Sequence, residues 1–176
     1  KNNIDINILE HINLKIACAL HNSIKQCFNI ETQIKWPNDL IINQKKCAGI
    51  LIESQINTVT NQYDCLVIGW GLNVYNQNFS EELKDIATTL QDNSNNILNR
   101  NKLLIHFFNN LNSFLYKIDI IEYYKQFMIP IGTWVKLSIN NSKQFVKIVD
   151  INSHGQLIVE TKDESILCLF NEEILI

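Results

Sequence analysis

Glycine is scarce in this sequence, and its scarcity limits where the chain can adopt unusual backbone conformations. Only five glycines occur in 176 residues, and three of them, Gly49, Gly69 and Gly71, fall in one short stretch. Glycine tolerates left-handed backbone and lets a ligand or a second segment approach the main chain closely. We therefore expect the functional site in the stretch that contains these three residues.

The overall composition is that of a globular protein. Hydrophobic residues make up 46% of the chain and charged residues 19%, with a formal net charge of -3, a balance that disfavours disorder. At about 100–200 residues per domain, the length allows one domain with a small appendage. No apolar run approaches the ~18 residues that span a bilayer. No charged-then-apolar leader opens the sequence, so nothing points to secretion.

Metal centres, disulfide frameworks and nucleic-acid binding are disfavoured as well. The four histidines show no zinc-ligand spacing. The five cysteines include no Cys-x-x-Cys pair and lie mostly in apolar stretches, which indicates free thiols in a reducing cytoplasm. The net charge is negative, Arg100 is the one arginine, and no basic stripe interleaves with aromatic residues. This pattern predicts no nucleic-acid partner.

The first part of the chain combines one helix with several short strands. Apolar residues at spacings of three and four predict an amphipathic helix over 5–28, with Lys15 on its polar face. Shorter apolar runs predict strands over 34–36, 40–42, 48–53 and 64–74. The first of these must end at Pro37, because proline cannot donate to a strand ladder.

Helical signals return in the middle of the chain. A helix is expected over 81–87, and Asp119 with Glu122 resembles a capping box that opens a further helix through Phe127. Between them, a firm amphipathic helix is predicted by seven apolar residues on one broad face: Leu103, Leu104, Phe107, Phe108, Leu111, Phe114 and Leu115.

Beyond Pro130 the pattern is purely β. Four short strands, over 133–139, 143–151, 156–161 and 165–170, are joined by polar turns at regular spacing. A tail of this size is too small for a large core of its own, so it should pack on the preceding part or on a partner. We expect an α+β fold: a mixed sheet packed by helices over 1–129, followed by a small C-terminal β-barrel over 130–176.

Three ordered motifs distinguish the glycine-containing stretch. The first is Lys35-Trp36-Pro37-Asn38-Asp39; an ordinary Pro-Asn-Asp turn would explain its last three residues but not Lys35-Trp36. The second begins at Lys46 and runs through Gly49 to Glu53, and the third spans 67–74. In a strand, the alternation of side chains places Gly69 and Gly71 on one face, where a flat ligand could lie against the backbone.

Together these motifs resemble those of biotin protein ligases, also described as biotin–acetyl-CoA-carboxylase ligases. Family members carry Lys-Trp-Pro-Asn-Asp, Lys-x-x-Gly-Ile-Leu-x-Glu and Gly-x-Gly-x-Asn-Val in this order, and Ala87-Thr88-Thr89-Leu90 is similar to a further family segment. The resemblance covers essentially the whole chain. It implies a class II synthetase-like biotin ligase domain that ends in a barrel of the Src-homology-3 type.

The resemblance also implies a reaction in two steps. The carboxylate of biotin attacks the α-phosphate of ATP, giving biotinyl-5′-AMP and pyrophosphate, with Mg²⁺ as the metal. A lysine amine of the biotin carboxyl carrier protein of acetyl-CoA carboxylase then takes the biotinyl group and releases AMP. The first step needs no general base, because a carboxylate is already ionised at neutral pH. Its obstacle is repulsion between two anions, which fixed cations reduce.

By the same resemblance, Lys46 and Asp39 are the catalytic candidates. Lys46 is expected to meet the biotin carboxylate and the α-phosphate, whereas its neighbour Lys45 reads as a surface lysine in a turn. Asp39 is also the candidate Mg²⁺ ligand, since hard cations prefer oxygen. The expected biotin-binding residues are Lys46, Gly49 and Gly69. The expected ATP-binding residues are Lys35, Asn38, Asp39, Gly71 and Asn73, of which Asn38 would orient Asp39 and Asn73 would read adenine.

The sequence departs from the family pattern at its start. The family's early strand for the biotin ring and its Gly-Arg-Gly-Arg-x-Gly-Arg loop are absent from these 176 residues, as is the helix-turn-helix of repressor-type members. We therefore expect the C-terminal part of a ligase, weakly active or inactive as it stands. An exposed strand edge would favour pairing with a second copy of the chain. A lipoate-type ligase and a non-catalytic remnant that only binds a carrier domain remain as alternatives.

Overall fold

Two β-sheets form the frame of the protein. A computed structural model describes residues 9–57, 62–76, 78–117, 119–139, 142–170 and 172–175. The first sheet has the order β1-β2-β3-β4, from β1 (Gln33–Lys35), β2 (Asp39–Ile42), β3 (Lys45–Asn57) and β4 (Gln62–Leu72). The second has the order β8-β7-β6-β5-β9, from β5 (Trp134–Ile139), β6 (Ser142–Ile151), β7 (Leu157–Thr161), β8 (Ile166–Leu169) and β9 (Glu173–Leu175).

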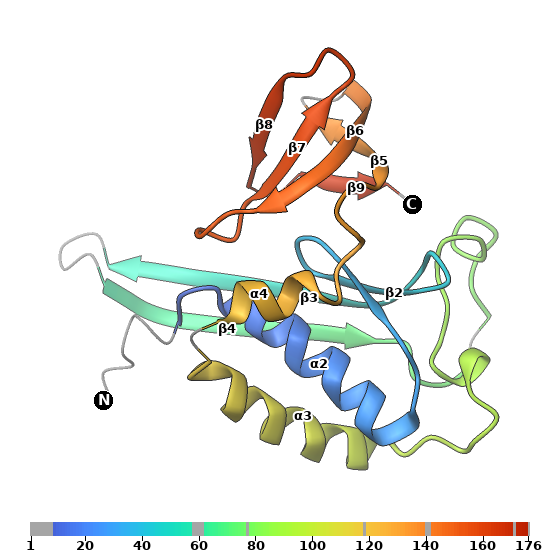
Figure 1. Ribbon diagram of the computed structural model, residues 1–176. Helices are drawn as coiled ribbons and strands as arrows, with labels where there is room; N and C mark the ends of the chain where they lie inside the picture. The colour runs from blue at the N-terminus through green and yellow to red at the C-terminus, as the bar shows by residue number, and fades with distance from the viewer. Residues whose placement is uncertain are drawn as a thin grey trace.

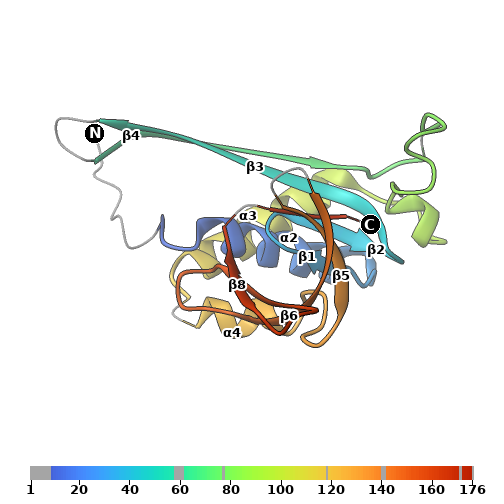
Figure 2. The same ribbon diagram turned by 90° about the horizontal axis from the view of Figure 1, so that it is seen from above.

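Helices cover one face of the first sheet. The helices α2 (Ile12–Phe28) and α3 (Arg100–Leu115) pack on each other beneath it, and the short α4 (Ile120–Lys125) lies between α2 and the second sheet (Figure 1). A single turn of 3-10 helix, η1, spans Gln91–Asn93. The opposite face of the first sheet stays open along the β3–β4 hairpin, where Leu51 and Val67 are exposed. Figure 2 shows this hairpin extending away from the second sheet.

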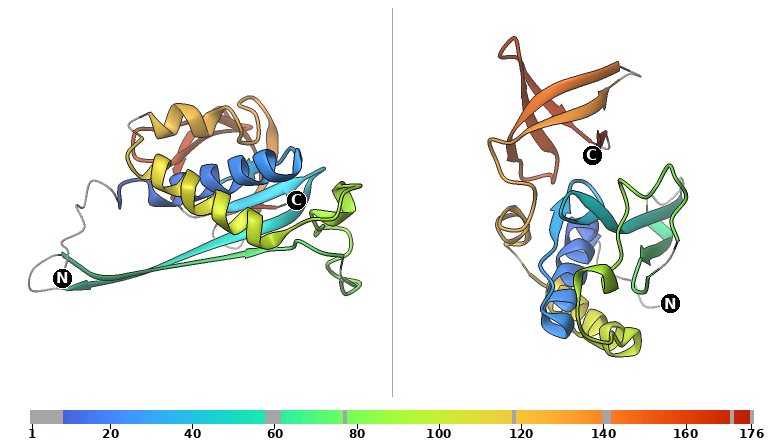
Figure 3. Two further views of the ribbon diagram at one scale, coloured as in Figure 1. Left: turned by 90° about the horizontal axis from the view of Figure 1, so that it is seen from below. Right: turned by 90° about the vertical axis from the view of Figure 1, so that its right-hand side faces the viewer.

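The α+β class expected from the sequence is confirmed. The strand pairs of the first sheet are antiparallel, and single parallel bridges join Ile34 to Met128 and Lys46 to Ala87. The second sheet is strongly curled (Figure 3). No pairing of β8 with β9 occurs among the described residues, so this sheet is barrel-like without closing into a barrel. The division into domains at 129/130 remains a prediction.

The first helix differs from its predicted form in two respects. Leu9 is helical, but His11 adopts a left-handed conformation (φ 55°) that interrupts the predicted helix, so α2 begins at Ile12; residues 5–8 lie outside the described residues. Lys15, expected on the polar face, is buried, and its ammonium donates to the carbonyl oxygen of Leu115 at 3.0 Å. That oxygen belongs to the last turn of α3, where a cation also meets the negative end of the helix dipole.

The apolar stripe of α3 is narrower than the sequence predicts. Leu103, Phe107 and Phe114 are buried, whereas Leu104 and Phe108 are exposed. The helix contacts α2 along one side, and Phe107 also packs on the ring of Trp70 from β4, with centroids 4.8 Å apart. Because α2 and Trp70 both contact α3 on the same side, the rest of its predicted apolar face is exposed to solvent.

Of the two other predicted helices, the one over 81–87 does not form, and the one that follows Asp119 forms but is shorter than predicted. Residues 81–86 form hydrogen-bonded turns rather than a helix, because Ala87 is drawn into a bridge with Lys46 of β3. The capping box at Asp119 does not form: its side chain makes no cap hydrogen bond, and α4 ends at Lys125 instead of reaching Phe127. Both segments are placed by contacts with distant strands rather than by local capping.

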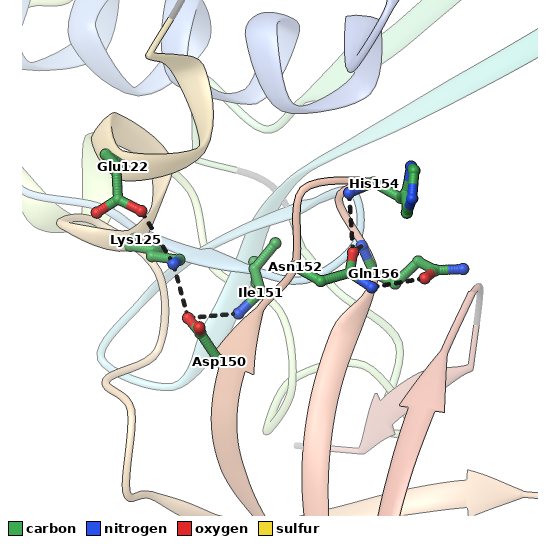
Figure 4. A network of polar contacts seen from close by, with 7 residues as sticks. All are labelled: Glu122, Lys125, Asp150, Ile151, Asn152, His154 and Gln156. Carbon is green, nitrogen blue, oxygen red and sulfur yellow. Dashed lines mark hydrogen bonds and ion pairs between the residues drawn. The ribbon is translucent and has the colours of Figure 1, made fainter.

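Polar contacts join the second sheet to the rest of the molecule. Lys125 of α4 lies 3.0 Å from Glu122 and 2.7 Å from Asp150 of β6, as Figure 4 shows. Burial alone would lower the pKa of Lys125, but the hydrogen bonds to these two carboxylates outweigh burial and raise it. The hydrogen bond from Lys125 holds the pKa of Asp150 below its usual value. The ion pair between Lys125 and Asp150 therefore links α4 to the second sheet.

Candidate active site

A pocket of about 770 Å³ opens where the two sheets meet. The ends of β2, β3 and β4 form its floor, the segment from Asn78 to Ala87 forms one wall, and β9 of the second sheet forms another. Because β9 ends the strand order of its sheet, one of its edges has no strand partner among the described residues. The pocket therefore combines the first sheet, the segment from Asn78 to Ala87 and strand β9, which lie far apart in the sequence.

Strand register brings the first two sequence motifs together on this floor. Lys35 and Asp39 lie opposite each other in the β1–β2 pair, and Asp39 lies opposite Gly49 in the β2–β3 pair. The turn between β1 and β2 holds a cis Trp36–Pro37 peptide bond, and Asn13 of α2 donates to the Pro37 oxygen at 2.7 Å. β1 ends at Lys35, before the proline, as the missing N–H of Pro37 requires.

A cluster of three charged side chains occupies the centre of the floor. The Asp39 carboxylate receives the Lys35 ammonium on one oxygen at 2.8 Å and the Lys46 ammonium on the other at 2.6 Å. The side chains of Lys35 and Asp39 are 5% and 7% exposed, whereas that of Lys46 is 47% exposed. Lys46 is therefore the member of the cluster that solvent or a ligand can reach.

Gly49 leaves the space in which Lys46 lies. A Cβ atom at this position would sit 3.0 Å from both Cε and Nζ of Lys46 and 3.2 Å from Oδ1 of Asp39. Any larger side chain would press directly on the Lys46–Asp39 pair. Gly49 lines the pocket, and its immediate effect is to permit this ion pair; its contact with biotin stays a prediction.

The glycines of β4 are not required by packing. Gly71 lies opposite Gly49 and lines the pocket, and a Cβ added to it would meet no described atom within 4 Å. Gly69 lies two pairs farther along, opposite Leu51, and is not among the described residues that line the pocket. Close strand packing therefore does not account for Gly71, which leaves an open surface on the pocket floor.

The two asparagines of the motifs hold the floor together. The side-chain amide of Asn38 donates to the main-chain oxygen of Ile50 at 2.8 Å, and the main-chain oxygen of Asn38 accepts a hydrogen bond from the Ile50 N–H. Asn73 donates from its amide to the Thr88 oxygen at 3.2 Å and lines the pocket. Contacts of Asn38 with ATP or Asp39 and of Asn73 with adenine remain predictions, as the described hydrogen bonds of both are structural.

Two residues of the motifs are packing residues. Trp36 is fully buried, and its indole N–H donates to the main-chain oxygen of Gly155. Cys47 is fully buried beside Lys46, and burial raises the pKa of its thiol to about 12. A thiol of this kind is protonated and unreactive at neutral pH.

Magnesium has no prepared cage in the described part of the chain. No group of three or more His, Cys, Asp or Glu side chains gathers there, and both oxygens of Asp39 already receive lysine ammoniums. Mg²⁺ commonly keeps its waters and is held by one or two carboxylates together with substrate phosphates. Asp39 fits a metal only if a lysine leaves it, so its role as a Mg²⁺ ligand stays a prediction without geometric support.

Several pocket residues were not identified from the sequence. Strand β9 was not predicted, yet Glu173, Ile174 and Leu175 line the pocket. The apolar pair Ile174-Leu175 is the local signal that could have indicated a strand. The wall from Asn78 to Ala87 carried no such signal, because its position follows from the bridge between Ala87 and Lys46.

The fold has well-matched counterparts among solved structures. The apo biotin protein ligase of Aquifex aeolicus superposes with a TM-score of 0.80 at 24% identity, over 95% of this chain and 75% of that one. The same enzyme in complex with biotin and ATP gives a TM-score of 0.77 at 25% identity, over 95% and 71%. The architecture is therefore that of a biotin protein ligase.

Sequence comparison leads to the same family. The Biotin/lipoate A/B protein ligase family matches residues 1–73. The bifunctional ligase/repressor BirA of Bacillus subtilis is 31% identical over 171 residues, which are 93% of this chain and 52% of that protein. BirA of Bacillus spizizenii is 32% identical over 160 residues, or 86% and 49%. In both fold and sequence the chain is therefore similar to biotin protein ligases, and it spans about half the length of these curated relatives.

No helix in the described part of the chain is both long and apolar enough to cross a membrane.

Proposed function

We propose that this chain carries the adenylate-forming site of a biotin protein ligase. The proposed reaction joins the carboxylate of biotin to the α-phosphate of ATP, releases pyrophosphate, and passes the biotinyl group to a lysine of a biotin carboxyl carrier protein with release of AMP. The observation that carries the proposal is the Lys35–Asp39–Lys46 cluster on the pocket floor, with Lys46 half exposed beside two glycines.

The charge of this cluster suits the chemistry of the first step. Two ammonium groups and one carboxylate give a net charge of +1 on a floor where both substrates bring anionic groups. A cation fixed at the reacting centre reduces the repulsion between a carboxylate and a phosphate and stabilises the charge that develops on the phosphate oxygens. We assign this role to Lys46.

The floor of the pocket suits a flat ligand. Gly71 lies opposite Gly49 across β3 and β4, and no described atom lies within 4 Å of a Cβ placed on it, so the backbone at Gly71 is not covered by side chains. We propose that biotin or its adenylate lies over these strands, with Asn73 near the nucleotide. The predicted contact of Gly69 with biotin would require the ligand to reach two residue pairs beyond the Gly49–Gly71 pair.

Binding of biotin and of lipoate by the purified chain tests the proposal. We expect biotin, and not lipoate, to raise the melting temperature. We also expect biotin together with ATP to give biotinyl-5′-AMP, detected by mass spectrometry, even if turnover is slow. Stabilisation by lipoate alone would assign the chain to the lipoate branch instead. Binding of a carrier domain without dependence on ATP or biotin would support a non-catalytic role.

A further inference from the structure

The contact between Lys35 and strand β9 ties the charged cluster to the second sheet. The Lys35 ammonium donates to the main-chain oxygen of Ile174 at 3.0 Å, in addition to its 2.8 Å pair with Asp39. Ile174 pairs with Leu137 of β5 on one side, and β9 is the last strand of its sheet. Lys35 thereby donates to a carbonyl at the sheet edge that faces the pocket.

This arrangement explains how Lys35 can stay charged while buried. Removing an ammonium from water is costly unless oxygen atoms replace the lost hydration. The carboxylate of Asp39 and the carbonyl of Ile174 supply two such oxygens. One comes from the first sheet and the other from the second, so the docked position of β9 helps to hold a positive charge beneath the pocket.

The buried charge of Lys35 changes what Lys46 can do. Lys46 is only 2.6 Å from Asp39, and an isolated Lys46–Asp39 pair would be neutral as a whole. Such a pair attracts an anion weakly, because the carboxylate cancels most of the field of the ammonium. With Lys35 on the second oxygen of Asp39, the cluster keeps a net charge of +1, and the exposed end of that cluster is Lys46.

We propose that Lys35 is a positioning residue: its ammonium, held by the Ile174 carbonyl of β9, balances Asp39 and leaves Lys46 free to bind an anion in the pocket. This differs from the direct contact with nucleotide phosphates that the sequence motif predicts for Lys35. On this proposal the second sheet also contributes to the anion site, because the Ile174 carbonyl oxygen of β9 accepts the hydrogen bond from Lys35. The identity of the anion rests on the proposed function, whereas the charge balance does not.

Pyrophosphate binding, measured by calorimetry at low ionic strength, tests the charge balance. Lys35→Met fills the buried space without charge and should weaken pyrophosphate binding by about tenfold, the loss expected for one nearby charge. The double variant Lys35→Met/Asp39→Asn restores the net charge of +1 through Lys46 alone. Its affinity should return to within about threefold of the unsubstituted chain, since a threefold change is under 1 kcal/mol. Lys45→Met, which removes an exposed charge outside the cluster, is the matched control and should have little effect.

Circular dichroism and melting temperatures confirm that each variant is folded before binding is compared. If Lys35 touched the anion directly, the double variant would remain far weaker than the unsubstituted chain, because the lost contact is not replaced, and the inference would be wrong. Unchanged binding by Lys35→Met, or no binding by the unsubstituted chain, would also overturn it. A chain that binds pyrophosphate in this pattern but binds neither biotin nor ATP would refute the proposed function alone.

Discussion

The indole N–H of Trp36 donates to the main-chain oxygen of Gly155 at 3.0 Å, which ties the first sequence motif to the turn between β6 and β7. Gly155 itself has a left-handed backbone (φ 76°), and a Cβ there would come within 3.2 Å of Nδ1 of His11. Three segments far apart in sequence thus meet at one point, and Trp36 is the buried side chain that joins them.

Replacing Trp36 should destabilise the whole molecule. Trp36→Phe removes the hydrogen bond to Gly155 and part of a fully buried ring, and we expect a loss of about 2 kcal/mol in the free energy of unfolding. Trp134, which is half exposed, provides the control: Trp134→Phe should change the free energy by about 0.5 kcal/mol or less. Urea unfolding followed by circular dichroism measures both, and equal losses would contradict the buried role of Trp36.

Two adjacent lysines should differ sharply in their effect on activation of biotin. Lys46→Gln removes the exposed cation of the cluster, and we expect biotin-dependent ATP–pyrophosphate exchange to fall by a factor of about 100 or more. Lys45 donates to the Lys84 oxygen at the surface, so Lys45→Gln should leave the exchange rate unchanged. Exchange that survives Lys46→Gln would remove Lys46 from the proposed chemistry.

The glycines of β4 offer a test of the pocket floor. A Cβ atom at position 71 meets no described atom within 4 Å, so we expect Gly71→Val to fold normally but to fill space needed by the ligand. We expect ATP binding, measured by calorimetry, to weaken by about tenfold or more, a cost of roughly 1.4 kcal/mol. Gly69→Val places the same side chain outside the pocket and should bind ATP as the unsubstituted chain does. Equal weakening in both would place the nucleotide over Gly69 as well.

Stability should fall at acidic pH because of a buried histidine. His21 lies against Thr32 and the ring of Phe127, and burial lowers its pKa from 6.5 to about 4. The unfolded chain takes up a proton below pH 6.5, whereas the folded chain resists it until pH 4. The free energy of unfolding should therefore decrease by roughly 3 kcal/mol over this window.

The variant His21→Gln isolates this contribution. It keeps a polar group near Thr32 but does not titrate, so the difference between its pH dependence and that of the unsubstituted chain belongs to His21. Urea midpoints measured from pH 7 to pH 4 provide the comparison. Parallel curves for the two proteins would show that His21 is not held neutral by burial.

The five cysteines should separate into reactive and protected groups. Cys65 and Cys168 are exposed, whereas Cys18 and Cys47 are fully buried, and burial raises the pKa of both buried thiols. Iodoacetamide should therefore alkylate Cys65 and Cys168 first in the native protein. Mass spectrometry of digests identifies the labelled sites. Rapid native labelling of Cys47 would contradict its position beneath the pocket.

Local sequence patterns predicted much of the secondary structure. Strands β2, β3 and β4 and the core of α3 lie where the apolar runs and helical spacing indicate them. The motif around Pro37 marked the turn between β1 and β2, because proline and asparagine restrict the backbone through their own geometry. Predictions failed where distant contacts decide the outcome, as in the turns of residues 81–86 and the buried Lys15.

The sequence by itself indicated a resemblance to biotin protein ligases and predicted the residues on which such a site would depend: Lys35, Asp39, Lys46 and the three clustered glycines. Tertiary structure alone decided how those residues are used. Only the folded chain places Lys35 between Asp39 and a carbonyl 139 residues away, and only strand register sets Gly49 against the Lys46–Asp39 pair. The reason is physical: a motif specifies side chains and local turns, but the partners that stabilise a buried charge come from whichever segments pack against it.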